Sequence, residues 1–320
     1  MVSDRILSLP GRGNTYFYFT KMGTEGFSED QISYIENIIR SYRERFSLLE
    51  ITGVWDFGME EGAKYSGEKY GDFAACKDNA VFNIEMMSIS YNHIRVSKMP
   101  ANIPDEELQK ILRRYDVVKE LSLMAAGLRE KLMNSGTHPR EIELEVDRAA
   151  RLILEREGFP FSNSEDTSSG ESAKTDPVCS GAAVKERTSF SERNGLCFDP
   201  GPHNHLPLED PLFADVWAIR KLEETMSIRR LTVHELGHAI SHYYGILGLK
   251  AVKKLFAKCR EGFEDLDEFC AECFMASEIT DRIPLANSLS ALIEEQRTGA
   301  KLYRKSPAIQ SVHNSKRRNH

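Results

Sequence analysis

The sequence predicts an α+β protein, in which the first hundred residues form a small sheet and most of the remaining chain is helical. Short segments rich in aromatic and β-branched residues, which favour strands, occur in the first part. Beyond Pro100 the apolar residues recur at helical spacing instead. A length of 320 residues and a hydrophobic content of 41% suit one large domain or two modest ones.

Three segments of the first part are predicted to contain strands: residues 14–21 ("NTYFYFTK"), residues 50–57, and residues 79–98 with one or two strands. Between the first two segments, "SEDQ" at residues 28–31 has the form of a capping box. The apolar residues behind it recur at helical spacing and predict a helix; they are Ile32, Ile35, Ile38, Ile39, Tyr42 and Phe46. Residues 1–98 are therefore expected to form the N-terminal sheet and helix of the domain.

Two amphipathic helices are predicted next, within residues 104–133 and 137–158, and they indicate a helical insertion at residues 99–160. Residues 161–193 are rich in Ser, Thr, Gly and charge, and they contain almost no large apolar side chain. Because such a segment cannot bury enough apolar surface to offset its ordering entropy, we expect a disordered linker there.

Ordered structure is expected to resume in residues 194–303, with one helix over residues 211–226, a second over residues 228–244 and two or three more. Residues 304–320 are predicted to be a basic, flexible tail. The net charge of -7 argues against a dedicated nucleic-acid binder, which usually carries a basic excess. The remaining possibility is a weak contact of the tail with nucleic acid or another acidic partner.

The expected compartment is a reducing cytoplasm. Six cysteines in a chain of this length do not indicate a disulfide framework. The N-terminal residues lack the cationic start and apolar run of a signal peptide. No stretch approaches the roughly 18 uninterrupted apolar residues of a membrane helix, so we expect no membrane partner.

The segment "RRLTVHELGHAISHYYG" at residues 229–245 carries the pattern HExxH. His234 and His238 are four residues apart, so a helix places both imidazoles on one face. Glu235 lies beside that pair and can reach a water molecule on a shared ion. The pattern therefore predicts two zinc ligands and a general base. Gly237 is small enough to permit close packing against a neighbouring helix.

A catalytic zinc usually has three protein ligands and one open position. Downstream, "FEDLDEFCAECFMASEI" at residues 263–279 offers Glu268 and Glu272, four apart on one helical face. We assign Glu268 as the third ligand. Glu272 is then the carboxylate that orients a ligand histidine through its other ring nitrogen. In the alternative, Glu268 is a solvated helix residue and another acid is the ligand, namely Glu264, Asp265 or Glu272.

Cys270 and Cys273 form a CxxC pattern within this second helix. The simplest interpretation is that both are small apolar core residues. The alternatives are a thiolate ligand for the same zinc and a redox pair. His242 lies one turn too far along to share the ion comfortably.

These residues resemble the gluzincin metallopeptidases. "RRLTVHELGHAISH" and the spacing of 30 residues from His238 to Glu268 resemble the ImmA/IrrE-type peptidases. "EFCAECF" is similar to the segment that carries the glutamate ligand in the anthrax lethal-factor-like catalytic domain. Both resemblances select Glu268 as the ligand, and the orienting role of Glu272 carries over only from the second. Together they cover residues 229–276.

The resemblance implies a zincin-like catalytic domain that uses Zn2+ as its cofactor and hydrolyses a peptide bond. Glu235 would be the general base, and the substrate would be a protein or peptide, such as a regulatory repressor. "AVFNIEM" at residues 80–86 is a candidate edge strand for holding that substrate in extended form. Two alternatives stay open: a catalytically silent zinc-binding module with a regulatory or interaction role, and a helical interaction protein without metal.

Overall fold

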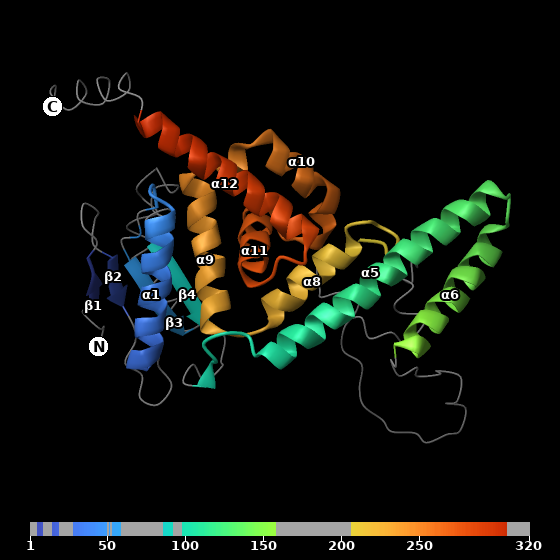
Figure 1. Cartoon of the computed structure of the whole chain (residues 1–320), viewed down its shortest axis with the longest axis horizontal. Coiled ribbons are helices and arrows are strands. Elements are labelled where there is room, and N and C mark those ends of the chain that lie inside the picture. The colour runs from blue at the N-terminus through green and yellow to red at the C-terminus, as the bar shows by residue number, and fades with distance from the viewer. Residues whose placement is uncertain are drawn as a thin grey trace, which may run out of the picture. The chain divides into compact units, whose positions relative to one another are not determined.

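The computed structural model describes residues 5–8, 15–18, 28–49, 51, 53–58, 86–91, 98–157 and 206–305. This part of the chain is predominantly helical (Figure 1). Its longer helices contain 10 to 30 residues, whereas its strands contain 3 to 6. The α+β class predicted from the sequence is therefore wrong. The reason is that most of the described residues lie after residue 100, where apolar side chains recur at helical spacing. Strand-like patterns occur only in short segments.

The short strands form one ladder in the order β1-β2-β3-β4. β1 (Arg5–Leu7) pairs antiparallel with β2 (Thr15–Tyr18). β2 pairs parallel with β3 (Gly53–Gly58), which pairs parallel with β4 (Met86–Tyr91). β4 lies against α9, the helix that carries the HExxH motif. The proposed substrate strand at residues 80–86 falls almost wholly outside the described residues.

Helix α1 (Glu29–Arg45) begins at the predicted capping box. The Gln31 amide donates to Ser28 Oγ, and the Ser28 amide donates to Gln31 Oε1 at 2.8 Å, which satisfies two amides at the helix start. The predicted apolar stripe is buried along this helix. Phe46, just beyond the helix, meets Tyr244 edge-on with ring centroids 5.7 Å apart, so α1 packs on the end of α9.

The chain divides into two compact units, residues 1–112 with 218–320, and residues 113–217. The second unit contains most of α5 (Asp105–Asn134) and all of α6 (Pro139–Arg156). These helices pack through two small apolar clusters: Val117, Leu121, Ala150, Ile153 and Leu154 in one, and Ala125, Ile142 and Val146 in the other. The predicted linker at 161–193 lies outside the described residues, as does the predicted tail beyond residue 305.

The first unit holds the remaining helices. They are α8 (Phe213–Glu224), which crosses the unit boundary, α9 (Ile228–Tyr243), η3 (Ile246–Gly248), α10 (Lys250–Cys259), η4 (Arg260–Gly262), α11 (Leu266–Ile279) and α12 (Pro284–Lys305). At the start of α9, the Ser227 hydroxyl accepts a hydrogen bond from the Arg230 amide. At the start of α11, the Asp265 carboxylate accepts hydrogen bonds from the amides of Asp267 and Glu268. Figure 1 shows α9 and α11 side by side, and α12 packs against α11.

Among the described residues, no helix combines the length and the apolar character needed to cross a membrane. The cytoplasmic compartment stays a prediction.

Candidate metal centre

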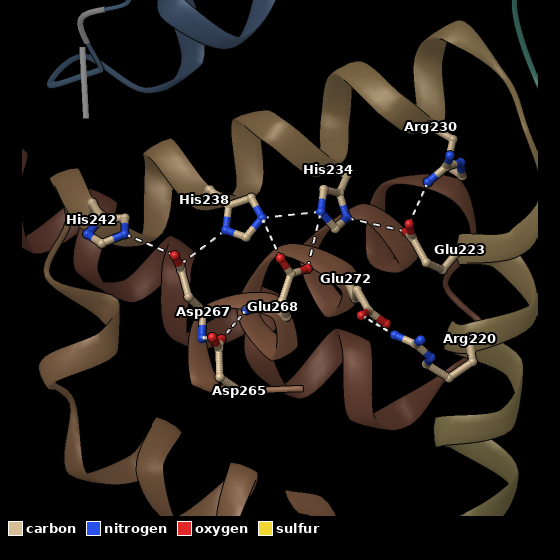
Figure 2. A network of polar contacts seen from close by, with 10 residues as sticks. All are labelled: Arg220, Glu223, Arg230, His234, His238, His242, Asp265, Asp267, Glu268 and Glu272. Carbon is tan, nitrogen blue, oxygen red and sulfur yellow. Dashed lines mark hydrogen bonds and ion pairs between the residues drawn. The ribbon is translucent and has the colours of Figure 1, made fainter. Parts of the chain in front are cut away.

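Three side chains from α9 and α11 converge on one point (Figure 2). The Nε2 atoms of His234 and His238 lie 3.2 Å apart, as expected for imidazoles one helical turn apart on the same face. Glu268 places its Oε2 atom 3.4 Å from His234 Nε2 and its Oε1 atom 3.5 Å from His238 Nε2. The structure thus brings together the three residues that the sequence assigned as ligands.

The spacing of these atoms suits a tetrahedral zinc ion. Ligand atoms about 2.0–2.1 Å from such an ion stand roughly 3.3 Å from one another. The two imidazole nitrogens lie 3.2 Å apart, and each has a different oxygen of Glu268 close to it, at 3.4 Å from His234 and 3.5 Å from His238. Two imidazole nitrogens and a carboxylate oxygen are also a donor set that zinc accepts. In the part of the chain that the structure describes, this is the group of His, Cys, Asp and Glu side chains that could hold a metal.

The three donor residues differ in burial. His234 is buried, with 8% of its surface exposed, whereas His238 and Glu268 are half-buried. The cluster is therefore closed around His234 and reaches solvent near Glu268. A catalytic metal needs such an opening, because the fourth position must exchange water and substrate.

The charges around the cluster favour cations. Burial lowers the pKa of His234, but contacts with Glu223 and Glu268 outweigh it and raise that pKa to about 10. Burial likewise lowers the pKa of His238, and Asp267 reverses the shift and raises it. The contact with His234 lowers the pKa of Glu268 in spite of burial. The carboxylates around the two histidines therefore favour positive charge at this point, as a bound metal ion would supply.

Glu235, the predicted base, is partly buried on α9. Burial raises the pKa of its carboxyl group, against the opposing effect of His234 and His238. A carboxylate with a raised pKa accepts a proton more readily near neutral pH. The environment of Glu235 thus suits general-base work.

The carboxylates at the outer nitrogens of the histidines are not the one that the sequence predicted. Glu223 Oε2 lies 3.3 Å from His234 Nδ1, and Asp267 Oδ1 lies 3.2 Å from His238 Nδ1. Asp267 could have been suspected because it adjoins Glu268 in the first turn of α11. Glu223 lies on a separate helix, and nothing in its local sequence marks it.

Glu272 forms an ion pair with Arg220 of α8 instead (Figure 2). It is buried, with 2% of its surface exposed. Burial raises the pKa of Glu272 to about 8, although Arg220 opposes the shift. The structure therefore places Glu272 in a contact between α8 and α11, and places Glu223 and Asp267 at the histidine nitrogens.

The remaining candidates lie in other contacts. Asp265 is the N-cap of α11 and accepts two backbone amides, at 2.8 and 2.9 Å. Cys270 and Cys273 are fully buried, form no disulfide and lie outside the metal-capable group. His242 Nε2 lies 3.1 Å from Asp267 Oδ2. These positions favour capping, core and supporting roles.

Comparison of the chain with protein-family models, curated proteins and solved structures gave no match. The functional interpretation therefore depends on the residues of the site and their geometry.

Proposed function

We propose that this chain is a zinc-dependent metallopeptidase that hydrolyses a peptide bond of a protein or peptide. One observation carries the proposal: the Nε2 atoms of His234 and His238 lie 3.2 Å apart, and the Glu268 carboxylate places one oxygen within 3.5 Å of each of them, so the three side chains can share one zinc ion. Bound zinc would lower the pKa of a coordinated water and polarise the scissile carbonyl. If the same three residues bind zinc but the chain cleaves no peptide, the chain is a zinc-binding module.

Glu235 follows directly after the first ligand on α9. In the proposed reaction its carboxylate takes the proton of the attacking water and then gives that proton to the leaving amine. Its raised pKa supports both steps, because a strongly acidic carboxyl group would be a poor donor to the amine. The resemblance to ImmA/IrrE-type peptidases favours a regulatory protein as the substrate.

The test combines zinc content with peptide cleavage, measured on the purified full chain and on matched variants. Wild-type protein should bind one zinc and cleave a generic peptide library. Glu235→Gln should keep the zinc and lose cleavage, because it changes the base and leaves the ligands. Glu268→Ala should lose zinc, while Glu261→Gln, at an exposed position of η4, should behave as wild type.

Each contrary outcome has a definite meaning. If wild type and Glu235→Gln cleave the library alike, the catalytic proposal is wrong. Stoichiometric zinc without turnover in any substrate pool would indicate a zinc-binding regulatory or interaction module. A wild-type chain that binds no zinc after reconstitution would indicate a helical interaction protein.

A further inference from the structure

Glu223 on α8 links two residues of α9. Its Oε1 atom accepts a hydrogen bond from Arg230 Nη1 at 2.8 Å, and its Oε2 atom lies 3.3 Å from His234 Nδ1 (Figure 2). The Arg230 side chain is only 4% exposed, so separation of the pair would leave a buried charge without its partner carboxylate. Arg230 is fixed in turn, because its Nη2 atom donates to Met226 Sδ at 3.1 Å. Arg230 therefore holds Glu223 in place from the side that faces away from the proposed zinc site.

The contact matters because an imidazole has two nitrogens. For His234 to offer a lone pair at Nε2, its neutral form must carry the proton at Nδ1. A carboxylate beside Nδ1 favours that tautomer, fixes the ring plane and makes Nε2 a stronger donor. Glu223 occupies this position, on the side of the ring opposite Glu268.

Asp267 stands in the same relation to His238. Its Oδ1 atom lies 3.2 Å from His238 Nδ1, and its Oδ2 atom lies 3.1 Å from His242 Nε2. Its backbone amide donates to Asp265 Oδ1 at 2.8 Å, so the N-terminal turn of α11 holds it. Each ligand histidine thus has its own carboxylate, and the two carboxylates come from different helices.

The Arg220–Glu272 ion pair explains how α8 reaches this position. Arg220 and Glu223 are three residues apart on α8 and share a face of that helix. Arg220 contacts Glu272 of α11 while Glu223 contacts His234 of α9. α8 is therefore connected to both ligand-bearing helices by charged side chains on one face.

We propose that Glu223, held by Arg230, is the positioning residue of His234, that Asp267 is the positioning residue of His238, and that together they set the zinc affinity of the site. This inference depends on the proposed zinc site and adds residues outside the HExxH and Glu268 motifs. Carboxylates in this position contribute about 10- to 100-fold to metal affinity where they have been removed.

The test measures zinc affinity of the full chain by competition with a chromophoric chelator. Glu223→Gln should weaken zinc binding about 10- to 100-fold, since an amide lacks the negative charge at Nδ1. Glu223→Asp should recover part of the loss. Glu224→Gln is the matched control, because Glu224 is the next residue, lies on the surface and pairs with Lys221. Its zinc affinity should equal that of wild type.

Two further measurements distinguish a change in the orientation of the His234 ring from a general loss of structure. With Co2+ in place of zinc, Glu223→Gln should change the visible absorption bands, whereas Glu224→Gln should not. In zinc-loaded wild type labelled with 15N-histidine, both ligand rings should show a protonated Nδ1 and a metal-bound Nε2. This last measurement needs no variant, so it decides the matter even if Glu223→Gln fails to fold.

Equal zinc affinities of Glu223→Gln and Glu224→Gln would overturn the inference, and so would an Nδ1-bound ring in the labelled wild type. Either result leaves the proposed zinc site intact, because wild type still binds the metal. A wild-type chain that binds no zinc would instead remove the proposed function itself, so the two failures are distinguishable.

Discussion

Gly237 of α9 lies directly against the backbone of Ala271 of α11. A Cβ atom added at Gly237 would stand 2.8 Å from Ala271 Cα and 3.1 Å from its carbonyl oxygen. Gly237 precedes His238, and Ala271 lies three residues after Glu268, and both His238 and Glu268 belong to the proposed zinc site. The close approach of the two helices therefore occurs at the level of the proposed zinc site, and it confirms the packing role predicted for Gly237.

Replacement of Gly237 by alanine should weaken both the fold and the site. The added methyl group would meet backbone atoms that cannot rotate away, so α9 and α11 must separate. Overpacking of this kind costs about 1–3 kcal/mol of unfolding free energy. The separation also draws Glu268 away from the histidines, so zinc affinity should fall. Denaturant unfolding and chelator competition measure the two effects.

The control for this change is Gly299→Ala in α12, where an added Cβ meets nothing within 4 Å. It should leave zinc affinity unchanged and stabilise the helix by roughly 0.5–1 kcal/mol, as alanine generally does in place of a helical glycine. If Gly237→Ala were as stable as Gly299→Ala and bound zinc as tightly, the close packing would have no role in the site.

A cluster around Arg45 predicts how stability depends on pH. Glu294 Oε1 accepts from Arg45 Nε at 3.1 Å and from Arg45 Nη2 at 2.8 Å, and Glu294 Oε2 accepts from Arg297. Burial alone would raise the pKa of Glu294, but the two guanidinium groups outweigh it and lower that pKa below its usual 4.5. Its contribution to stability is therefore fully present above about pH 4.5 and is lost as pH falls through the lower folded value.

Glu294→Gln should consequently destabilise the chain near neutral pH by about 0.5–1 kcal/mol, a small effect because the side chains are partly exposed. The difference from wild type should shrink as pH falls below about 4.5, because both chains then lack the charge. Thermal unfolding at a series of pH values measures it. Glu295→Gln, an exposed neighbour, should show no such difference. A stability difference that grows on acidification would contradict the assignment.

Local patterns predicted the helices well, because a helix depends on residues close together in the chain. The capping box at Ser28 and the HExxH face each need only the geometry of a single helix. The predicted fold class was wrong because short aromatic segments indicate strands but not how much of the chain a sheet contains. The described part of the chain is mainly helical.

The carboxylates that contact the outer nitrogens of the two histidines could not be predicted in the same way. Glu223 meets His234 only because the end of α8 brings its side chain to α9, and the spacing of residues along one helix does not predict such a contact. Glu272 shares a helical face with Glu268, which made it the natural partner for a histidine. The structure gives that face a second neighbour, Arg220, and Glu272 pairs with it.

Zinc binding should release protons. In the metal-free chain, contacts with Glu223 and Glu268 raise the pKa of His234 to about 10, so it is protonated at neutral pH. A metal must displace the proton at Nε2, whereas Glu268, with a lowered pKa, has none to lose. Zinc affinity should therefore rise with pH between about 6 and 8. Calorimetry in buffers of different ionisation enthalpy should show about one to two protons released per zinc. An affinity that does not change over that range would contradict the protonated state of His234.

Cys270 and Cys273 should behave as core residues and not as a thiolate zinc ligand or a redox pair. Both thiols are fully buried, and burial raises the pKa of Cys270 to about 12. Because the thiolate is the reactive form, alkylation at pH 8 should modify neither residue until the chain unfolds. Mass mapping of the labelled peptides measures this.

Cys270→Ala should lower stability through the small cavity it leaves, and its zinc stoichiometry should equal that of wild type. Glu268→Ala provides the contrast, since it removes a donor atom from the cluster. If Cys270→Ala instead released zinc while Glu268→Ala kept it, the third ligand would be a thiolate. The donor set would then resemble that of a structural zinc site more than that of a peptidase.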